Sequence, residues 1–173
     1  MNTEATSVVT YGGLSKEELL NELKRADIQL NEFAAILLES PHCSITPTKH
    51  SLTIKEVTVE SLGLPRGGTL SEISEGARRK GLGACPLEAA FYIRLSCPDL
   101  EEIKVSVKTP NQNPPGALVI YTESLEQDDT FPRGLYLRKI EEKSWLRGYR
   151  CSEDYLWAPS DRFLFQIGGQ FEV

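Results

Sequence analysis

The last third of the chain combines aromatic rings with basic side chains, a pattern that can hold an anionic group. The candidate ligand-binding residues are Arg138, Trp145, Arg147, Tyr149 and Arg150. Guanidinium groups bind carboxylates and phosphates and stack on aromatic rings. Six basic side chains face two acidic ones between positions 131 and 151, although the whole chain carries a net charge of -6. We expect a negatively charged partner or ligand here, but the same residues could simply be cross-strand pairs that hold a sheet together.

A second candidate is an enzyme whose active site contains Glu88 and Cys85. Cys85 precedes Pro86 near the predicted start of a helix, where the helix dipole would lower the pKa of the thiol. Glu88, three residues further on, would then act as acid or base. The simpler interpretation is a packed cysteine and a carboxylate that stabilises a helix N-terminus. We prefer that interpretation and expect no catalytic residues.

Neither a metal nor a cofactor is expected. His42, Cys43 and His50 lie close in sequence, but adjacent residues in an extended loop point apart, and no Cys-x-x-Cys pair occurs. A cluster of acidic residues could chelate a divalent ion; it comprises Glu123, Glu126, Asp128 and Asp129. The cluster lacks the spacing of a calcium loop, and a solvated turn explains it better. No glycine-rich nucleotide motif is present.

Binding of nucleic acid is a third alternative. A pI near 5.1 means that the molecule as a whole repels a phosphate backbone. The segment FAAILLES, where a helix-turn-helix protein would have its recognition helix, contains no Lys or Arg. Single-stranded nucleic acid could still bind the aromatic and basic residues of the last third by stacking, so this alternative stays open, although the acidic composition disfavours it.

The elements that must position these residues begin with helices. Ser15 and Glu18 have the spacing of a capping box and predict a helix over 15–25. Asn31 caps a second helix that ends near Ser40, because Pro41 follows. Residues 27–30 are expected to be a turn and residues 1–13 a flexible lead-in. A third helix, capped by Thr69 or Ser71, runs to Gly81, and a short fourth runs from Leu87 to about Phe91.

Strands follow the helices. Alternating apolar residues predict them over 52–59, with a possible bulge at Lys55-Glu56, and over later segments: 103–107, 117–121, 135–138, 145–150 and 162–167. Early helices and late hairpins predict an α+β fold, in which N-terminal helix pairs pack on a largely antiparallel sheet of about five or six strands. One face of such a sheet would remain open to solvent or a ligand.

Residues 14–38 and 70–95 can be laid over one another as two helix pairs joined by short turns. Two copies are too few for a stacked repeat array, so we favour two independent solutions to packing a helix pair on a sheet.

We expect a single α+β domain over 14–173. The chain has neither a run of 18 to 20 apolar residues nor the pattern of a secretion signal, and a cytoplasmic location with no membrane contact is expected.

The stretch LGLPRGGTLSEISEGARRKGLGACPLEAAFYIRL, followed by GLYLR, WLRGY and PSDRFLF, resembles a group of small bacterial proteins with no assigned activity. The resemblance implies a bacterial or phage origin and supplies no site residues. The sequence therefore predicts a non-enzymatic binding or regulatory domain. Its partner would be a protein or a small anionic ligand, held by the arginine and aromatic residues of the last third.

Overall fold

The structure is a computed structural model that describes residues 6–96 and 117–168. This part of the chain contains four α-helices: α1 (Lys16–Arg25), α2 (Glu32–Glu39), α3 (Leu70–Arg79) and α4 (Leu87–Ser96). It contains eight strands: β1 (Thr6–Tyr11), β2 (Ile28–Leu30), β3 (His50–Thr58), β4 (Leu82–Gly83), β5 (Leu118–Ile120), β6 (Gly134–Ile140), β7 (Lys143–Tyr149) and β8 (Arg162–Ile167). The expected α+β class is confirmed.

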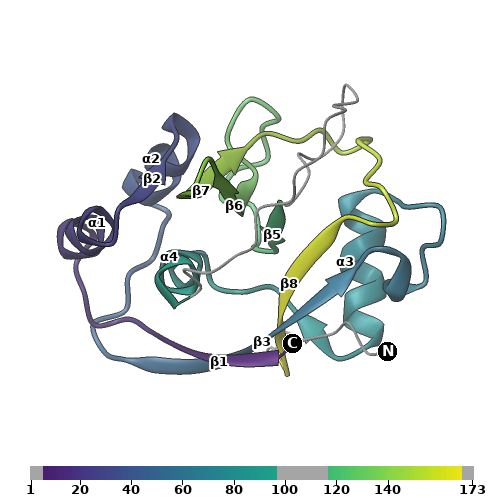
Figure 1. Cartoon of the computed structure of the whole chain (residues 1–173). Coiled ribbons are helices and arrows are strands. Elements are labelled where there is room, and N and C mark those ends of the chain that lie inside the picture. The colour runs from purple at the N-terminus through teal and green to yellow at the C-terminus, as the bar shows by residue number, and fades with distance from the viewer. Residues whose placement is uncertain (1–5, 97–116, 169–173) are drawn as a thin grey trace.

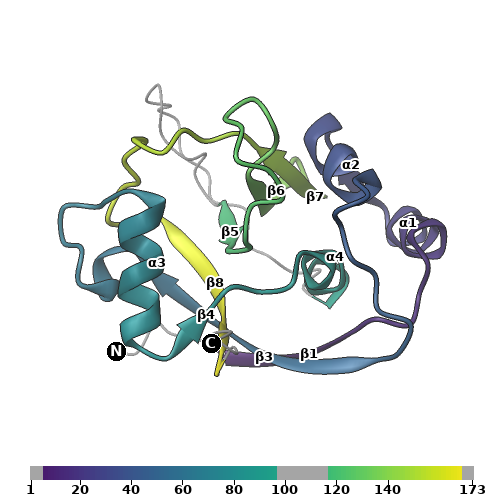
Figure 2. The same ribbon diagram turned by 180° about the vertical axis from the view of Figure 1, so that it is seen from behind.

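The strands form one sheet in the order β1-β3-β8-β5-β6-β7-β2, and β4 pairs with the side of β8. This sheet curls around α4 (Figure 1, Figure 2). The prediction of a largely antiparallel sheet with five or six strands was wrong, because β5 pairs with β8 in parallel and β2 pairs with β7 in parallel. The sheet is mixed, and it is larger than predicted because three short or N-terminal strands were not expected.

Both faces of the sheet are covered. Helices α1, α2 and α4 pack on one side, which we call the α4 face, and share a core with residues such as Leu135, Leu137 and Leu164. Helix α3 packs on the other side, the α3 face, over a second core that contains Val119, Phe163 and other apolar side chains. The expectation of one largely open face therefore does not hold for the central strands.

Strand β3 shows why the sequence suggested a bulge. Leu52 and Ile54 belong to the core on the α4 face, whereas Val57 and Val59 belong to the core on the α3 face. The pairing of β3 with β1 and with β8 runs without interruption through Lys55. The alternation of apolar residues therefore shifts at the point where the buried side chains of β3 change from one face of the sheet to the other. No extra residue is inserted.

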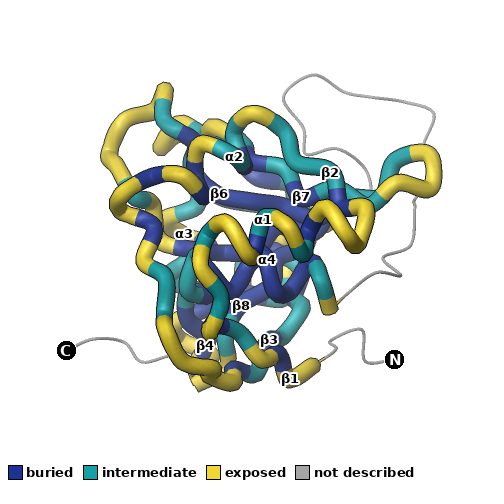
Figure 3. The backbone as a smooth tube through the Cα atoms, turned by 90° about the vertical axis from the view of Figure 1, so that its left-hand side faces the viewer, coloured by how far each residue is buried: buried dark blue, intermediate teal, exposed yellow. Residues whose placement is uncertain are grey.

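The first three helices lie where the sequence predicts them. Ser15 and Glu18 form the expected capping box at α1, Asn31 caps α2, and Thr69 with Glu72 forms a second capping box at α3. Helix α4 runs to Ser96, so the expected end near Phe91 was wrong. It is buried around nearly its whole circumference (Figure 3), and a helix that is enclosed on all sides shows no amphipathic period in its sequence.

Three strands were missed. Residues 6–11, predicted as a flexible lead-in, pair with β3 as β1, and the predicted turn at 27–30 contains β2. Strands β2 and β4 have three and two residues, too few to show alternation. The predicted strand over 103–107 lies outside the described residues.

The two helix pairs do share an arrangement. Each has a helix, a short strand and a second helix, and each short strand follows a residue with positive φ, Asp27 at 58° and Gly81 at 75°. The two strands join the sheet differently, because β2 pairs with β7 in parallel and β4 pairs with β8 antiparallel. The helices also pack differently, because α1 and α2 lie on the same face of the sheet whereas α3 and α4 lie on opposite faces, so only the first pair packs on the sheet as a pair.

Candidate functional site

The candidate site lies on a hairpin that β6 and β7 form. Seven residue pairs join the strands in antiparallel register, and Glu141 and Glu142 make the connection with φ values of 49° and 67°. Positive φ at both central positions is the geometry of a tight type I′ turn, whose twist matches that of the strands. The turn thus fixes which side chains of the two strands lie opposite each other.

The register places the predicted arginines and aromatics together. Arg138 lies opposite Trp145, and Tyr136 lies opposite Arg147. Residues directly opposite in an antiparallel pair share a face, and Tyr136 belongs to the core on the α3 face. We call Tyr136, Arg138, Trp145 and Arg147 the hairpin face. Their neighbours Leu135, Leu137 and Leu146 point to the opposite side and into the core beneath α2.

Arg147 is held by an aromatic ring rather than by a carboxylate. Its guanidinium carbon lies 5.0 Å from the centroid of the Trp145 ring. In the described part of the chain, no hydrogen bond or ion pair joins a carboxylate to Arg138, Arg147 or Arg150. Within the same residues the enclosed Nε of Arg147 has no hydrogen-bond partner. The positive charges on the hairpin face are therefore not neutralised by described acidic side chains.

Tyr149 is placed in the aromatic cluster beside the hairpin face. Its ring lies 6.3 Å from that of Tyr136 and 5.7 Å from that of Trp157, between ring centroids. Burial raises the pKa of the Tyr149 hydroxyl well above its usual range. These contacts indicate that Tyr149 supports the hairpin face from one end rather than presenting its ring to a ligand.

Arg150 lies apart from the other predicted site residues. Its guanidinium carbon is 5.0 Å from the ring centroid of Phe33 in α2. The backbone of Phe33 in turn lies against Gly148, on the side of β7 that faces α2. Arg150 is therefore directed toward the α4 face of the sheet, whereas Arg147 is directed toward the α3 face.

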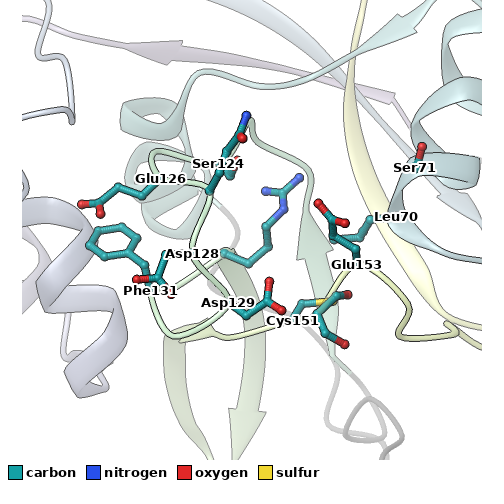
Figure 4. Close-up of a pocket in the computed structure, with 12 residues that line it drawn as sticks. Leu70, Ser71, Ser124, Glu126, Asp128, Asp129, Phe131, Cys151 and Glu153 are labelled. Atoms are coloured by element: carbon teal, nitrogen blue, oxygen red, sulfur yellow. The ribbon is translucent and has the colours of Figure 1, made fainter.

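Arg133, next to the hairpin, was not predicted individually as a site residue. Arg133 lines a pocket of about 530 Å³, whose other side chains include Asp128, Asp129 and Glu153 (Figure 4). One guanidinium nitrogen of Arg133 donates to the carbonyl of Thr122 at 2.7 Å, and the guanidinium lies 5.4 Å from the Tyr121 ring centroid. Arg133 is therefore held by a backbone carbonyl and by an aromatic ring.

The possible metal ligands do not converge within the described residues. Asp128 accepts from the backbone and the hydroxyl of Thr130, and these hydrogen bonds lower the pKa of Asp128. Cys43 is buried, and His50 contacts the Thr48 hydroxyl at 3.2 Å. No group of three or more His, Cys, Asp or Glu in residues 6–96 and 117–168 is arranged to hold a metal ion.

Cys85 and Glu88 are both buried at the start of α4. Burial raises the pKa of the Cys85 thiol to about 12, so the expectation that the helix dipole lowers it was wrong. The desolvation penalty for a thiolate exceeds the attraction of the helix end here. The Glu88 carboxylate accepts hydrogen bonds from Thr46. A protonated thiol at neutral pH is a poor nucleophile, and this removes the main support for a thiol enzyme.

No family model, curated protein or solved structure compared with the chain matches it. Among the helices of the described residues, none has the length and apolar character required to cross a membrane. Functional inference therefore rests on the geometry of the hairpin face and of the cavities.

Proposed function

We propose that this protein is a non-enzymatic binding domain that docks an acidic segment of a protein partner on the hairpin face. The observation that carries the proposal is the placement of two arginines beside Trp145, Arg138 across the strand pair and Arg147 along β7, with no described carboxylate bound to either guanidinium. Arg147 lies against the indole ring, which limits the rotamers it must lose when a carboxylate binds.

The composition of the hairpin face favours a protein partner over a small anion. Trp, Tyr and Arg are the residue types that contribute most to protein–protein binding energy. The local excess of positive charge in an acidic molecule would also orient an acidic partner toward this surface. An acidic peptide supplies carboxylates for both arginines and an apolar stem for the indole.

The test is a titration of the protein with a hexaglutamate peptide, followed by the fluorescence of Trp145 in a Trp157→Phe background. We expect saturable binding that weakens as salt is added. The Arg138→Gln/Arg147→Gln double variant should bind at least about tenfold more weakly, since hydrogen bonds to charged groups contribute about 1.5–3 kcal/mol each. Arg150→Gln is the matched control, because Arg150 lies over Phe33 on the opposite side of β7.

Equal binding by the double variant and the parent protein would refute the proposal. Two further probes separate the alternatives. Inorganic pyrophosphate that binds more tightly than the peptide would favour a small anionic ligand. An oligothymidine that quenches Trp145 more strongly than the peptide at equal salt would favour single-stranded nucleic acid.

A further inference from the structure

A cavity of about 1160 Å³ opens at the N-terminal end of α4, away from the hairpin face. Its lining comes from β1, the segment before β3 and its first residue, α3, β4, the start of α4, the residues after β5 and the end of β8. Arg138, Trp145 and Arg147 do not line it. Any ligand of this cavity would therefore bind independently of the proposed protein partner.

The cavity contains a buried carboxylate. Glu88 lines the cavity, and only 2% of its surface is exposed. One carboxylate oxygen accepts from the Thr46 hydroxyl at 2.9 Å, and the Thr46 amide lies 3.1 and 3.2 Å from the two oxygens. A carboxylate offers about four acceptor positions, so one hydroxyl and one shared N–H leave part of this capacity unused.

No described cation neutralises Glu88. In residues 6–96 and 117–168, no ion pair includes this carboxylate. The nearby ammonium of Lys16 donates to the Ser40 carbonyl at 2.7 Å, and Arg78, which also lines the cavity, bonds to Glu75. Burial is the main cause of the raised pKa of Tyr11 and Tyr92, and the negative charge of Glu88 raises both pKa values further.

Aromatic rings line the same cavity. Tyr11 and His50 line the cavity with ring centroids 5.7 Å apart, and Tyr11 also lies 6.5 Å from the ring of Tyr92. Tyr121 and Phe165 line the cavity as a stacked pair. A buried carboxylate costs free energy unless a positive group pairs with it, and aromatic faces also attract cations.

We propose that this cavity binds a small organic cation, with an ammonium or guanidinium head on the Glu88 carboxylate and an apolar body against the aromatic rings. The helix N-terminus also stabilises the Glu88 carboxylate. The cation would occupy the acceptor positions that Thr46 leaves unused. The volume is large enough for a compact amine, since ligand pockets usually enclose about 300–1,000 Å³.

The test compares benzylammonium with benzyl alcohol, which has nearly the same shape and no charge. Binding is followed by the NMR shift of the Thr46 amide, whose N–H donates to Glu88. We expect a saturable shift with benzylammonium and at least about tenfold weaker binding of the alcohol, because charge-assisted hydrogen bonds are roughly twice as strong as neutral ones. Agmatine tests the guanidinium head in the same way.

The Glu88→Gln variant should lose this preference and bind both probes alike. Glu123→Gln is the matched control, because Glu123 lines the same cavity but is exposed. Two results would overturn the proposal. One is that neither cation, at about 20 mM, gives a saturable shift of the Thr46 amide. The other is that the parent protein binds the amine and the alcohol with equal affinity. This comparison uses the parent protein and so remains decisive even if Glu88→Gln does not fold.

Discussion

Asn31 illustrates how one side chain can serve two elements at once. Its carbonyl oxygen accepts from the backbone N–H of Ala34, which caps α2, and from the backbone N–H of Gly148 at 2.8 Å. Its amide nitrogen donates to the Gly148 carbonyl at 3.0 Å. Asn31 therefore fixes α2 to β7, directly behind the hairpin face.

The first residue-scale prediction concerns this anchor. Asn31→Ala should lower the free energy of unfolding by about 2–4 kcal/mol, because a helix cap and two further hydrogen bonds are lost together. Asn31→Asp keeps the acceptor and loses the donor, so its cost should be smaller. Urea denaturation measures both. The control is Ser15→Ala at α1, which removes a cap alone and should cost about 1 kcal/mol. If Asn31→Ala costs no more than Ser15→Ala, the bonds to Gly148 contribute nothing.

Cys85 gives the second residue-scale prediction, on pH dependence. Burial holds the pKa of the folded thiol at about 12, whereas in the unfolded chain it should lie at about 8.5. Because the folded pKa lies above the unfolded one, the folded protein holds the thiol proton more tightly than the unfolded chain does. The free energy of unfolding therefore has its full value below about pH 8.5 and decreases as the pH rises toward 12. The free energy of unfolding should therefore fall above about pH 9, by up to about 1.4 kcal/mol for each pH unit.

The measurement is a series of urea denaturation curves between about pH 8 and pH 10 for the parent protein and Cys85→Ala. Cys43 and Cys151, whose pKa values are also raised by burial, are common to both proteins and cancel in the comparison. The variant should start less stable and should lose less stability as the pH rises. Identical slopes would show that Cys85 ionises normally in the folded protein.

At the scale of elements, Gly76 shows where helix α3 meets the rest of the fold. A Cβ atom at this position would lie 2.6 Å from the carbonyl oxygen of Leu62 and 3.1 Å from the Leu62 side chain. The 3-10 helix Glu60–Leu62 therefore packs directly on the backbone of α3. The glycine weakens α3 as an isolated helix by about 1 kcal/mol, but it allows this close approach.

Gly76→Ala should therefore destabilise the protein by about 1–3 kcal/mol, since overpacking exceeds the gain in helix propensity. Ser71→Ala on the exposed side of α3 is the control and should be neutral or slightly stabilising. Thermal unfolding of the two variants distinguishes these effects. A higher melting temperature for Gly76→Ala than for the parent would mean that α3 can move away from Leu62 at little cost.

The sequence predicted elements whose signal is local and missed those defined by their partners. Capping side chains identify α1, α2 and α3, because Ser15, Asn31 and Thr69 bond to the first turn of their own helices. Strand β2 exists because β7 lies beside it, and α4 continues past Phe91 because the curled sheet encloses it. Such elements leave no periodic pattern, since their conformation depends on tertiary contacts.

The candidate site was predictable in the same partial way. The residue types in the last third identified the hairpin, and their spacing placed Trp145 and Arg147 on one side of β7. The register that adds Arg138 to them depends on the two-residue turn at Glu141 and Glu142, where positive φ is unusual for such residues. The cavity beside Glu88 could not be predicted, because its walls come from segments that are distant in the sequence.

At the scale of the whole molecule, strand β8 joins the two parts of the sheet. It pairs with β3 on one side and with β5 on the other, and it contributes Phe163 and Phe165 to one core and Leu164 to the other. Strands β1 and β3 pair with each other, and β5, β6, β7 and β2 form a second set of pairs, so the two parts of the sheet can join only after Arg162–Ile167 has been synthesised. Until then, the edges of β3 and β5 that later pair with β8 have no strand beside them, and the contacts that close the sheet come last along the chain.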